Sequence, residues 1–214
     1  MGLTLYSAWR ATAPYRVRIG LALKGLAYDY SPIDLIRGDQ RKAEYRAINR
    51  QGLTPALDIG GGRVLTQSLA ILEWLEEAHP EPPILPQDAL DRQIVRAMAL
   101  IIACDIHPLN NTRVGRKLNK MGVDQAGILE WTQGWICEGF DALEPLIERH
   151  GRGFAFGDKP TIADCCLIPQ IYSAQRYEVD LMPYPSIRSV ADRAANHPAF
   201  QMAHPNKQPD AVLS

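Results

Sequence analysis

Hydrophobic residues in the first 80 positions form short runs between polar loops, which is the pattern of alternating strands and helices. Strands are expected at Leu3–Tyr6 and Tyr28–Ile33, and a helix is expected between them at Pro14–Lys24. Pro14 suits the first helical turn, and Gly25 suits the left-handed position after the last turn. Because a strand, a helix and a strand follow one another, the two strands should pair in parallel.

Two further strands and two helices are expected before residue 80. A weak helix at Lys42–Ile48 is followed by Thr54–Ile59 and Arg63–Thr66, which flank three consecutive glycines and therefore predict a hairpin. Gln67 and Ser68 then open a helix that ends before Pro80. This order predicts an α/β unit with a mixed sheet.

After a proline-rich stretch the hydrophobic pattern becomes helical, and we find no convincing strand. We predict an α/β domain at residues 1–80, a linker at 81–90 and an all-helical domain at 91–214. Thr161 and Asp164 have the spacing of a capping box, which stabilises a helix start and carries no chemistry. The four helices expected in this part are Leu90–Leu118, Asp124–Arg149, Ile162–Tyr177 and Ser186–Asn196.

Composition excludes several functional classes. An apolar fraction of 46% and a charged fraction of 22% are typical of an ordinary soluble globular protein. A net charge of −1 gives no reason to expect nucleic acid or an anionic membrane as a partner, and we expect neither a membrane segment nor a signal peptide. The five histidines are scattered, so no metal site is expected. The four cysteines contain no Cys-x-x-Cys motif and are interpreted as reduced thiols of a cytoplasmic protein.

The start of the first predicted helix is a candidate anion site, because its backbone N–H groups and the helix dipole favour a negative charge. The glycine motifs of phosphate-binding loops are absent. The preceding loop carries one guanidinium, Arg10, and one hydroxyl close to the helix, Thr12. Thr12 either caps the helix or donates a hydrogen bond to a bound anion, and both roles are compatible.

Five segments of the chain carry a family resemblance: Leu5–Arg10, Arg16–Gly25, Gln67–Glu77, Cys104–Asn111 and Val179–Pro185. Together they resemble the zeta class of cytosolic glutathione transferases, which includes maleylacetoacetate and maleylpyruvate isomerases. The resemblance covers essentially the whole chain, and Cys104–Asn111 is similar to bacterial members in particular. It implies a thioredoxin-like first domain, a helical second domain, a small-molecule substrate, glutathione as cofactor and a homodimer.

The resemblance also assigns glutathione-binding residues. It implies a cis bond between Thr54 and Pro55, with the backbone of Thr54 pairing with the cysteinyl unit of glutathione. Gln67 and Ser68 are expected to bind the γ-glutamyl carboxylate at a second helix start, and Gln51 is expected to bind glutathione as well. Without the resemblance, Ser68 would be interpreted as a helix cap.

The loop before the first helix departs from the family. Zeta enzymes usually carry Ser-Ser-Cys after the arginine, whereas this chain has Ala11-Thr12-Ala13. Either Thr12 stabilises the glutathione thiolate in place of the missing serine, or the isomerase role has lapsed in favour of another glutathione-dependent reaction.

The activity implied is cis–trans isomerisation of a maleyl keto acid by thiolate addition, rotation and elimination. Because such substrates carry carboxylates, Arg10 and Arg176 are expected to hold them, with Thr12 beside the thiolate. His107, Asn110 and Asn111 have the spacing of one helical face and, with Arg113, are further candidates for substrate binding. Pro108 is expected to kink this helix and turn His107 toward the cleft.

Three other functions stay open. One is a transferase that conjugates glutathione to small electrophiles such as haloacids, and another is a non-catalytic glutathione-binding protein. The third is a thiol–disulfide oxidoreductase, against which the absence of cysteine between Leu3 and Tyr15 argues.

Overall fold

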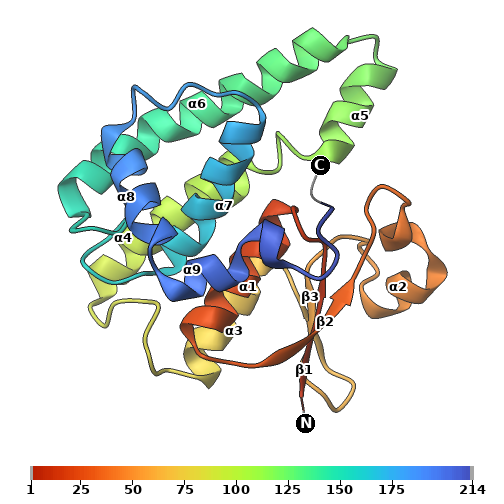
Figure 1. The fold of residues 1–214 in the computed structure, drawn as a ribbon, viewed down its shortest axis with the longest axis horizontal. Coiled ribbons are helices and arrows are strands. Elements are labelled where there is room, and N and C mark those ends of the chain that lie inside the picture. Colours follow the sequence, from red (N-terminus) through yellow and green to blue (C-terminus); the bar gives the residue numbers. More distant parts are fainter. Residues whose placement is uncertain (1, 213–214) are drawn as a thin grey trace. The chain divides into compact units, whose positions relative to one another are not determined.

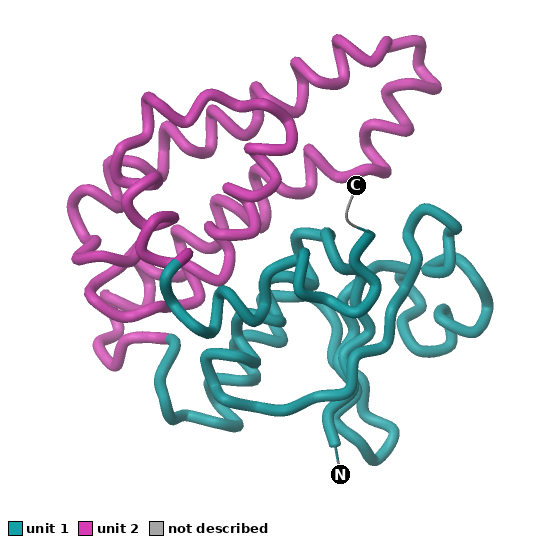
Figure 2. Tube along the Cα trace, in the orientation of Figure 1, with its two compact units in different colours: residues 1–84, 196–214 teal, residues 85–195 magenta. Residues whose placement is uncertain are grey.

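The computed structural model describes residues 2–212, and the chain divides into two compact units (Figure 2). Unit 1 contains residues 1–84 and 196–214, and unit 2 contains residues 85–195. This division differs from the predicted helical domain at 91–214, because the carboxyl-terminal segment packs with the α/β unit. The predicted linker at 81–90 also differs, since the first helix of unit 2 already begins at Ala89.

Unit 1 is built on a four-stranded mixed sheet with the order β2-β1-β3-β4. β1 (Leu3–Ser7) pairs in parallel with β2 (Tyr28–Pro32), as the strand-helix-strand order predicted. β3 (Ala56–Asp58) is antiparallel to both β1 and β4 (Val64–Thr66). The hairpin expected around the three glycines is therefore confirmed.

Four α-helices accompany this sheet: α1 (Thr12–Leu23), α2 (Ala43–Ile48), α3 (Ser68–Ala78) and α9 (Pro198–Ala203). Three-residue 3₁₀ turns precede α2 and follow α9. Sequence patterning did not predict α9, which begins at a proline and is only six residues long. Figure 1 shows α9, in blue, beside α1, in red, and the two helices are in contact.

Helix α1 is hydrophobic on nearly its whole circumference because it lies in the interior of unit 1. Val17, Ile19 and Leu21 are fully buried, and α1 contacts both α3 and α9. The helix ends as predicted at Gly25, whose φ of +65° suits glycine, and Gly25 N–H donates to Ala22 O over 3.1 Å. The sequence left open that Thr12 caps this helix. In the structure Ala11 occupies the N-cap position, and Thr12 is the first helical residue.

Unit 2 is helical, and beyond β4 the described residues form no further strand. The structure matches three predicted helices to within one residue at each end: Asp124–Arg149, Ile162–Tyr177 and Ser186–Asn196. The elements of unit 2 are α4 (Ala89–Leu100), the π-helix η2 (Ile101–Ile106), α5 (Thr112–Lys120), α6 (Gln125–His150), α7 (Ile162–Arg176) and α8 (Pro185–Ala195).

The prediction of a single helix at Leu90–Leu118 is wrong. The chain widens into a π-helix after Leu100, makes a turn through residues 107–111 and starts again as α5. Pro108 has no N–H to continue the backbone hydrogen bonds. Asn111 begins the new helix, because its Oδ1 accepts a hydrogen bond of 3.1 Å from the Arg113 N–H.

The capping box at the start of α7 is confirmed. Oγ1 of Thr161 accepts from the Ala163 N–H over 3.2 Å, and Oδ2 of Asp164 accepts from the Thr161 N–H over 2.8 Å. Oδ1 of Asp164 also accepts from the Ala155 N–H over 2.7 Å, so this carboxylate joins the preceding loop to the helix. Complete burial raises the pKa of Asp164 to about 6, although the hydrogen bonds from Ala155 and Thr161 act in the opposite direction.

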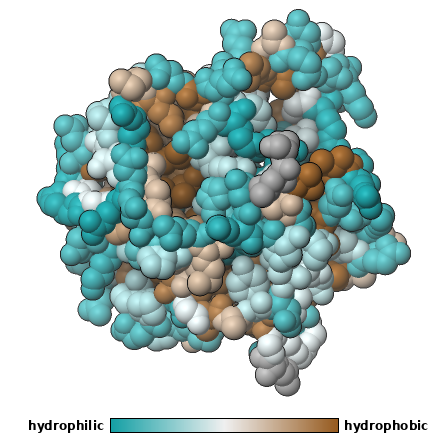
Figure 3. Space-filling view, in the orientation of Figure 1, coloured by the Kyte–Doolittle hydropathy of each residue, from teal (hydrophilic) through white to brown (hydrophobic). Residues whose placement is uncertain are grey.

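The surface carries a mixture of hydrophilic and hydrophobic residues, and hydrophilic ones predominate on the face shown in Figure 3. Among the described residues, no helix is both long and apolar enough to cross a membrane. The same part of the chain contains no cluster of three or more His, Cys, Asp or Glu side chains able to hold a metal ion.

Candidate active site

The amino ends of α1 and α3 lie at the same end of unit 1, because the two helices run parallel in contact. Three contacts at successive turns define this alignment. Arg16 contacts Ser68, Gly20 packs against Leu72, and Lys24 pairs with Glu76. Each step advances four residues on both helices, so α1 and α3 run in the same direction. Two helix dipoles therefore present their positive ends together.

The start of α1 offers few but well-placed hydrogen-bond donors. Thr12 and Ala13 are the first two helical residues, and their N–H groups have no partner within the helix. Pro14 at the third position has no N–H at all. The Thr12 side chain is partly exposed, so its hydroxyl is accessible to a ligand. This arrangement suits one small anionic group such as a thiolate.

Arg10 lies in the loop between β1 and α1 and is exposed to solvent. Its guanidinium carbon lies 5.4 Å from the centroid of the Trp9 ring, which is a cation–π arrangement. The guanidinium retains its hydrogen-bonding edge for a planar carboxylate.

The start of α3 brings three predicted residues together. Gln67 occupies the N-cap position with a φ of +67°, an unusual conformation for a residue other than glycine. Its Nε2 donates a hydrogen bond of 2.8 Å to Oε1 of Gln51. Ser68 is the first helical residue and is buried, and its Oγ accepts a hydrogen bond of 3.3 Å from Nη1 of Arg16. Ser68 is therefore not the helix cap.

The segment before β3 is fixed by side chains of α2 and of the residue after it. The Tyr45 hydroxyl and Nδ2 of Asn49 each donate a hydrogen bond of 2.7 Å to the carbonyl oxygen of Leu53. Burial raises the pKa of Tyr45 to about 12, so this hydroxyl keeps its proton at neutral pH. The bond between Thr54 and Pro55 is cis, as the family resemblance implied.

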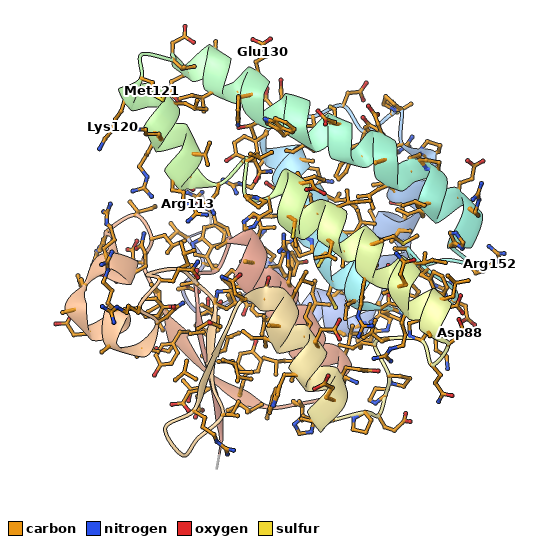
Figure 4. All side chains as sticks on the ribbon, turned by 180° about the vertical axis from the view of Figure 1, so that it is seen from behind. Asp88, Arg113, Lys120, Met121, Glu130 and Arg152 are labelled. Atoms are coloured by element: carbon orange, nitrogen blue, oxygen red, sulfur yellow. The ribbon has the colours of Figure 1, made fainter. Side chains whose placement is uncertain are left out.

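The other predicted residues belong to unit 2. Arg176 is the last residue of α7, where a cation is favourable, and it is exposed with its guanidinium carbon 5.8 Å from the Tyr177 ring centroid. Arg113 is exposed near the start of α5, where Figure 4 labels it, and Lys120 lies at the other end of that helix.

The prediction that His107, Asn110 and Asn111 share one helical face is wrong. All three lie in the turn between η2 and α5, so the helical spacing does not apply to them. The predicted kink at Pro108 is replaced by the end of the helix. His107 is partly exposed, and its N–H donates to Ile102 O over 2.9 Å, a bond of π-helical spacing.

Sequence reasoning assigned no role to two arginines of α1. Arg16 and Arg18 are 2% and 1% exposed, and each donates to groups around the candidate site. The signal available in the sequence was two arginines within a helix that is otherwise hydrophobic. A buried arginine requires partners that accept hydrogen bonds, but the sequence does not say which partners those are.

Comparison with known proteins agrees with this geometry. Models of the glutathione S-transferase N-terminal domain and C-terminal domain match residues 13–78 and 130–199. A maleylpyruvate isomerase of a Ralstonia species is 48% identical over 98% of this chain and 100% of its own length. A maleylacetoacetate isomerase of Pseudomonas aeruginosa is 47% identical over 97% of this chain and 98% of its own.

Solved structures give the same result. The holo structure of a maleylpyruvate isomerase, described as a bacterial glutathione S-transferase of the zeta class, superposes with a TM-score of 0.95 at 47% identity, covering 98% of this chain and 100% of that one. The maleylacetoacetate isomerase of Anaeromyxobacter dehalogenans with bound glutathione has a TM-score of 0.90 at 45% identity, covering 99% and 98%.

Fold and site together define a glutathione transferase, with a thioredoxin-like first unit and a helical second unit. Within that class, the chain belongs to the zeta-class family of maleylacetoacetate and maleylpyruvate isomerases.

Proposed function

We propose that this protein catalyses glutathione-dependent cis–trans isomerisation of a maleyl keto acid, maleylpyruvate or maleylacetoacetate, to its fumaryl isomer. The observation that carries the proposal is the full-length similarity to isomerases of both substrates. The two parallel helix starts of unit 1 support it, since one can bind the γ-glutamyl carboxylate and the other the thiolate of the same tripeptide.

Glutathione fits the residues present. The start of α3, with Ser68 and the exposed Gln67, is assigned to the γ-glutamyl carboxylate. Gln51 contacts Gln67 and is assigned to the same ligand, and the backbone of Thr54 is assigned to the cysteinyl unit. The hydroxyl of Thr12 and the first amides of α1 are assigned to the sulfur, whose ionised form they stabilise.

Bound glutathione supplies a thiolate that adds reversibly to the conjugated double bond, permits rotation about the resulting single bond and leaves unchanged. The chain itself holds the substrate while this happens. Arg10 and Arg176 are assigned to the substrate carboxylates and to the negative charge that develops on the conjugated carbonyl oxygen. His107, Asn111 and Arg113 are assigned to further substrate contacts.

The test is an assay of the purified protein with maleylpyruvate and with maleylacetoacetate, each with and without glutathione. We expect conversion to the fumaryl isomer only when glutathione is present, with the thiol recovered in full. Accumulation of a stable glutathione conjugate would instead indicate a transferase. Turnover without glutathione, or no glutathione binding at all, would contradict the proposal.

We further propose that the protein works in the cytoplasm as a homodimer. The proposal rests on the family resemblance and on the four cysteines of the sequence, which contain no Cys-x-x-Cys motif. Sedimentation analysis is expected to give about twice the mass of 23.8 kDa, whereas a monomer would contradict it.

A further inference from the structure

Trp9, the residue before Arg10, is held at both of its peptide groups by side chains distant in sequence. Its N–H donates a hydrogen bond of 3.1 Å to Oδ2 of Asp210, near the carboxyl end of the chain. Its carbonyl oxygen accepts a hydrogen bond of 2.6 Å from Nη2 of Arg18. Two charged side chains therefore restrict the backbone from which Arg10 projects.

The guanidinium of Arg18 is the centre of this arrangement. It is 1% exposed, and Nη1 also donates to Oγ of Ser7 over 3.0 Å and to the carbonyl oxygen of Ala8 over 3.4 Å. Its Nε donates to the carbonyl oxygen of Ala203 in α9 over 3.0 Å. One side chain thus ties the loop after β1 to the carboxyl-terminal segment.

Asp210 is itself held in place. Its Oδ1 accepts a hydrogen bond of 2.6 Å from the hydroxyl of Tyr30 on β2. Gln208, two residues earlier, donates from Nε2 to the carbonyl oxygens of Met202 and His204, over 3.1 and 2.9 Å. The segment Gln208–Asp210 is therefore fixed to both α9 and the sheet.

We propose that Arg18 and Asp210 are positioning residues of the active site, which hold Trp9 so that Arg10 points its guanidinium at the dicarboxylic substrate. The proposal rests on the proposed function, in which Arg10 binds that substrate. Through Trp9, the carboxyl-terminal segment thus contributes to substrate binding indirectly, without itself being assigned to a ligand. Misplacing a binding group by about 1 Å can lower the rate about 100-fold.

The experiment compares Asp210→Ala and Asp210→Asn with the wild-type protein. Alanine removes both hydrogen bonds, whereas asparagine can accept from the Trp9 N–H and donate to the Tyr30 hydroxyl. Asp58→Ala is the matched control, because Asp58 accepts a hydrogen bond of 2.7 Å from the Gly60 N–H in the hairpin of the same unit. The readouts are KM for the maleyl keto acid, KM for glutathione, and the hydrogen-exchange rate of the Trp9 amide measured by NMR.

We expect Asp210→Ala to raise KM for the keto acid about tenfold, to leave KM for glutathione within about twofold and to accelerate exchange at Trp9. Asp210→Asn is expected to restore KM for the keto acid, and Asp58→Ala to leave it unchanged. If Asp210→Ala does not fold, Tyr30→Phe is used with the same readouts, since it removes one partner of Asp210. Equal increases in both KM values, or rapid Trp9 exchange with an unchanged keto-acid KM, would overturn the positioning role.

This test is separable from that of the proposed function. If the wild-type protein isomerised neither keto acid, the proposed function would fail. Equilibrium binding of maleate, a simple cis dicarboxylate, would then replace KM in the same variants. Weakened maleate binding with faster Trp9 exchange would support the positioning role, and unchanged maleate binding would contradict it.

Discussion

Nη1 of Arg16 donates a hydrogen bond of 3.3 Å to Oγ of Ser68, and this contact joins the second turn of α1 to the first residue of α3 inside unit 1. When Oγ accepts from the guanidinium, the Ser68 hydroxyl proton is free to donate to an anion. The cation also raises the affinity of the nearby helix start for a carboxylate.

Arg16→Met is therefore expected to weaken glutathione binding about tenfold, because a charged hydrogen bond contributes about 1.5–3 kcal/mol. Ser68→Ala is expected to have a similar effect, and the double variant to lose less than the sum of the two. Titration calorimetry with glutathione provides the four affinities. Additive losses would show that Arg16 does not act through Ser68.

Thr12→Val is expected to raise the pKa of the thiol of bound glutathione by about one unit. One hydrogen bond to a charged acceptor is worth about 1.5–3 kcal/mol, and one pKa unit is about 1.4 kcal/mol. Thiolate absorbance, titrated against pH, measures this pKa. Thr12→Ser keeps the hydroxyl and serves as the control; an unchanged pKa in Thr12→Val would remove Thr12 from the mechanism.

Arg10→Ala and Arg176→Ala are each expected to raise KM for the keto acid about tenfold more than KM for glutathione, because each removes a guanidinium assigned to a carboxylate. Steady-state kinetics with each substrate varied in turn gives both constants. The control is Arg152→Ala, an exposed arginine labelled in Figure 4, which should change neither. Equal effects on both constants would indicate a structural role.

Lys24→Met is expected to destabilise the fold by about 3–5 kcal/mol, since it leaves a buried carboxylate without its cation. Nζ of Lys24 lies 2.6 Å from Oε2 of Glu76, and both side chains are at least nine-tenths buried. The double variant with Glu76→Leu should recover part of this loss. Urea unfolding measures both.

Lys42→Met is the control for that prediction, because Lys42 pairs with Asp39 at the same distance of 2.6 Å on the surface, with 62% of its side chain exposed. Its effect should be much smaller. Comparable losses for the two lysines would contradict the argument that burial makes the difference.

Protonation of His204 at acidic pH is expected to destabilise the fold. Partial burial lowers its pKa, and the positive charges of Arg18 and Lys207 lower it further. The neutral ring is thus favoured in the folded state, and Nδ1 accepts a hydrogen bond of 3.2 Å from the Asn206 N–H. Its contribution is therefore complete above the ordinary pKa of 6.5 and is lost as the pH falls through the lowered value.

His204→Asn keeps an acceptor for the Asn206 N–H and removes the titrating group. We expect the free energy of unfolding of the wild-type protein to fall more steeply than that of the variant between about pH 7 and pH 5. Urea unfolding at several pH values provides the comparison. Parallel curves would contradict the assignment.

Local sequence determined most of the elements of this protein. The strand-helix-strand pattern, the glycine hairpin, the left-handed Gly25 and the capping box of Thr161 and Asp164 each depend on residues close together in the chain, so local rules predicted them. The motifs also carried the family resemblance. That resemblance predicted glutathione as the cofactor and assigned its γ-glutamyl carboxylate to the helix start at Gln67 and Ser68.

The tertiary structure decided what depends on residues distant in sequence. Asp210 reaches Trp9 across 201 positions, and the carboxyl-terminal segment joins unit 1 instead of the helical unit that precedes it in the chain. The break between α4 and α5 was missed because hydrophobic spacing continues through Pro108, whereas the backbone hydrogen bonds do not. Hydrogen bonds to buried arginines are likewise satisfied by whichever acceptors the fold brings near, and no periodicity in the sequence records them.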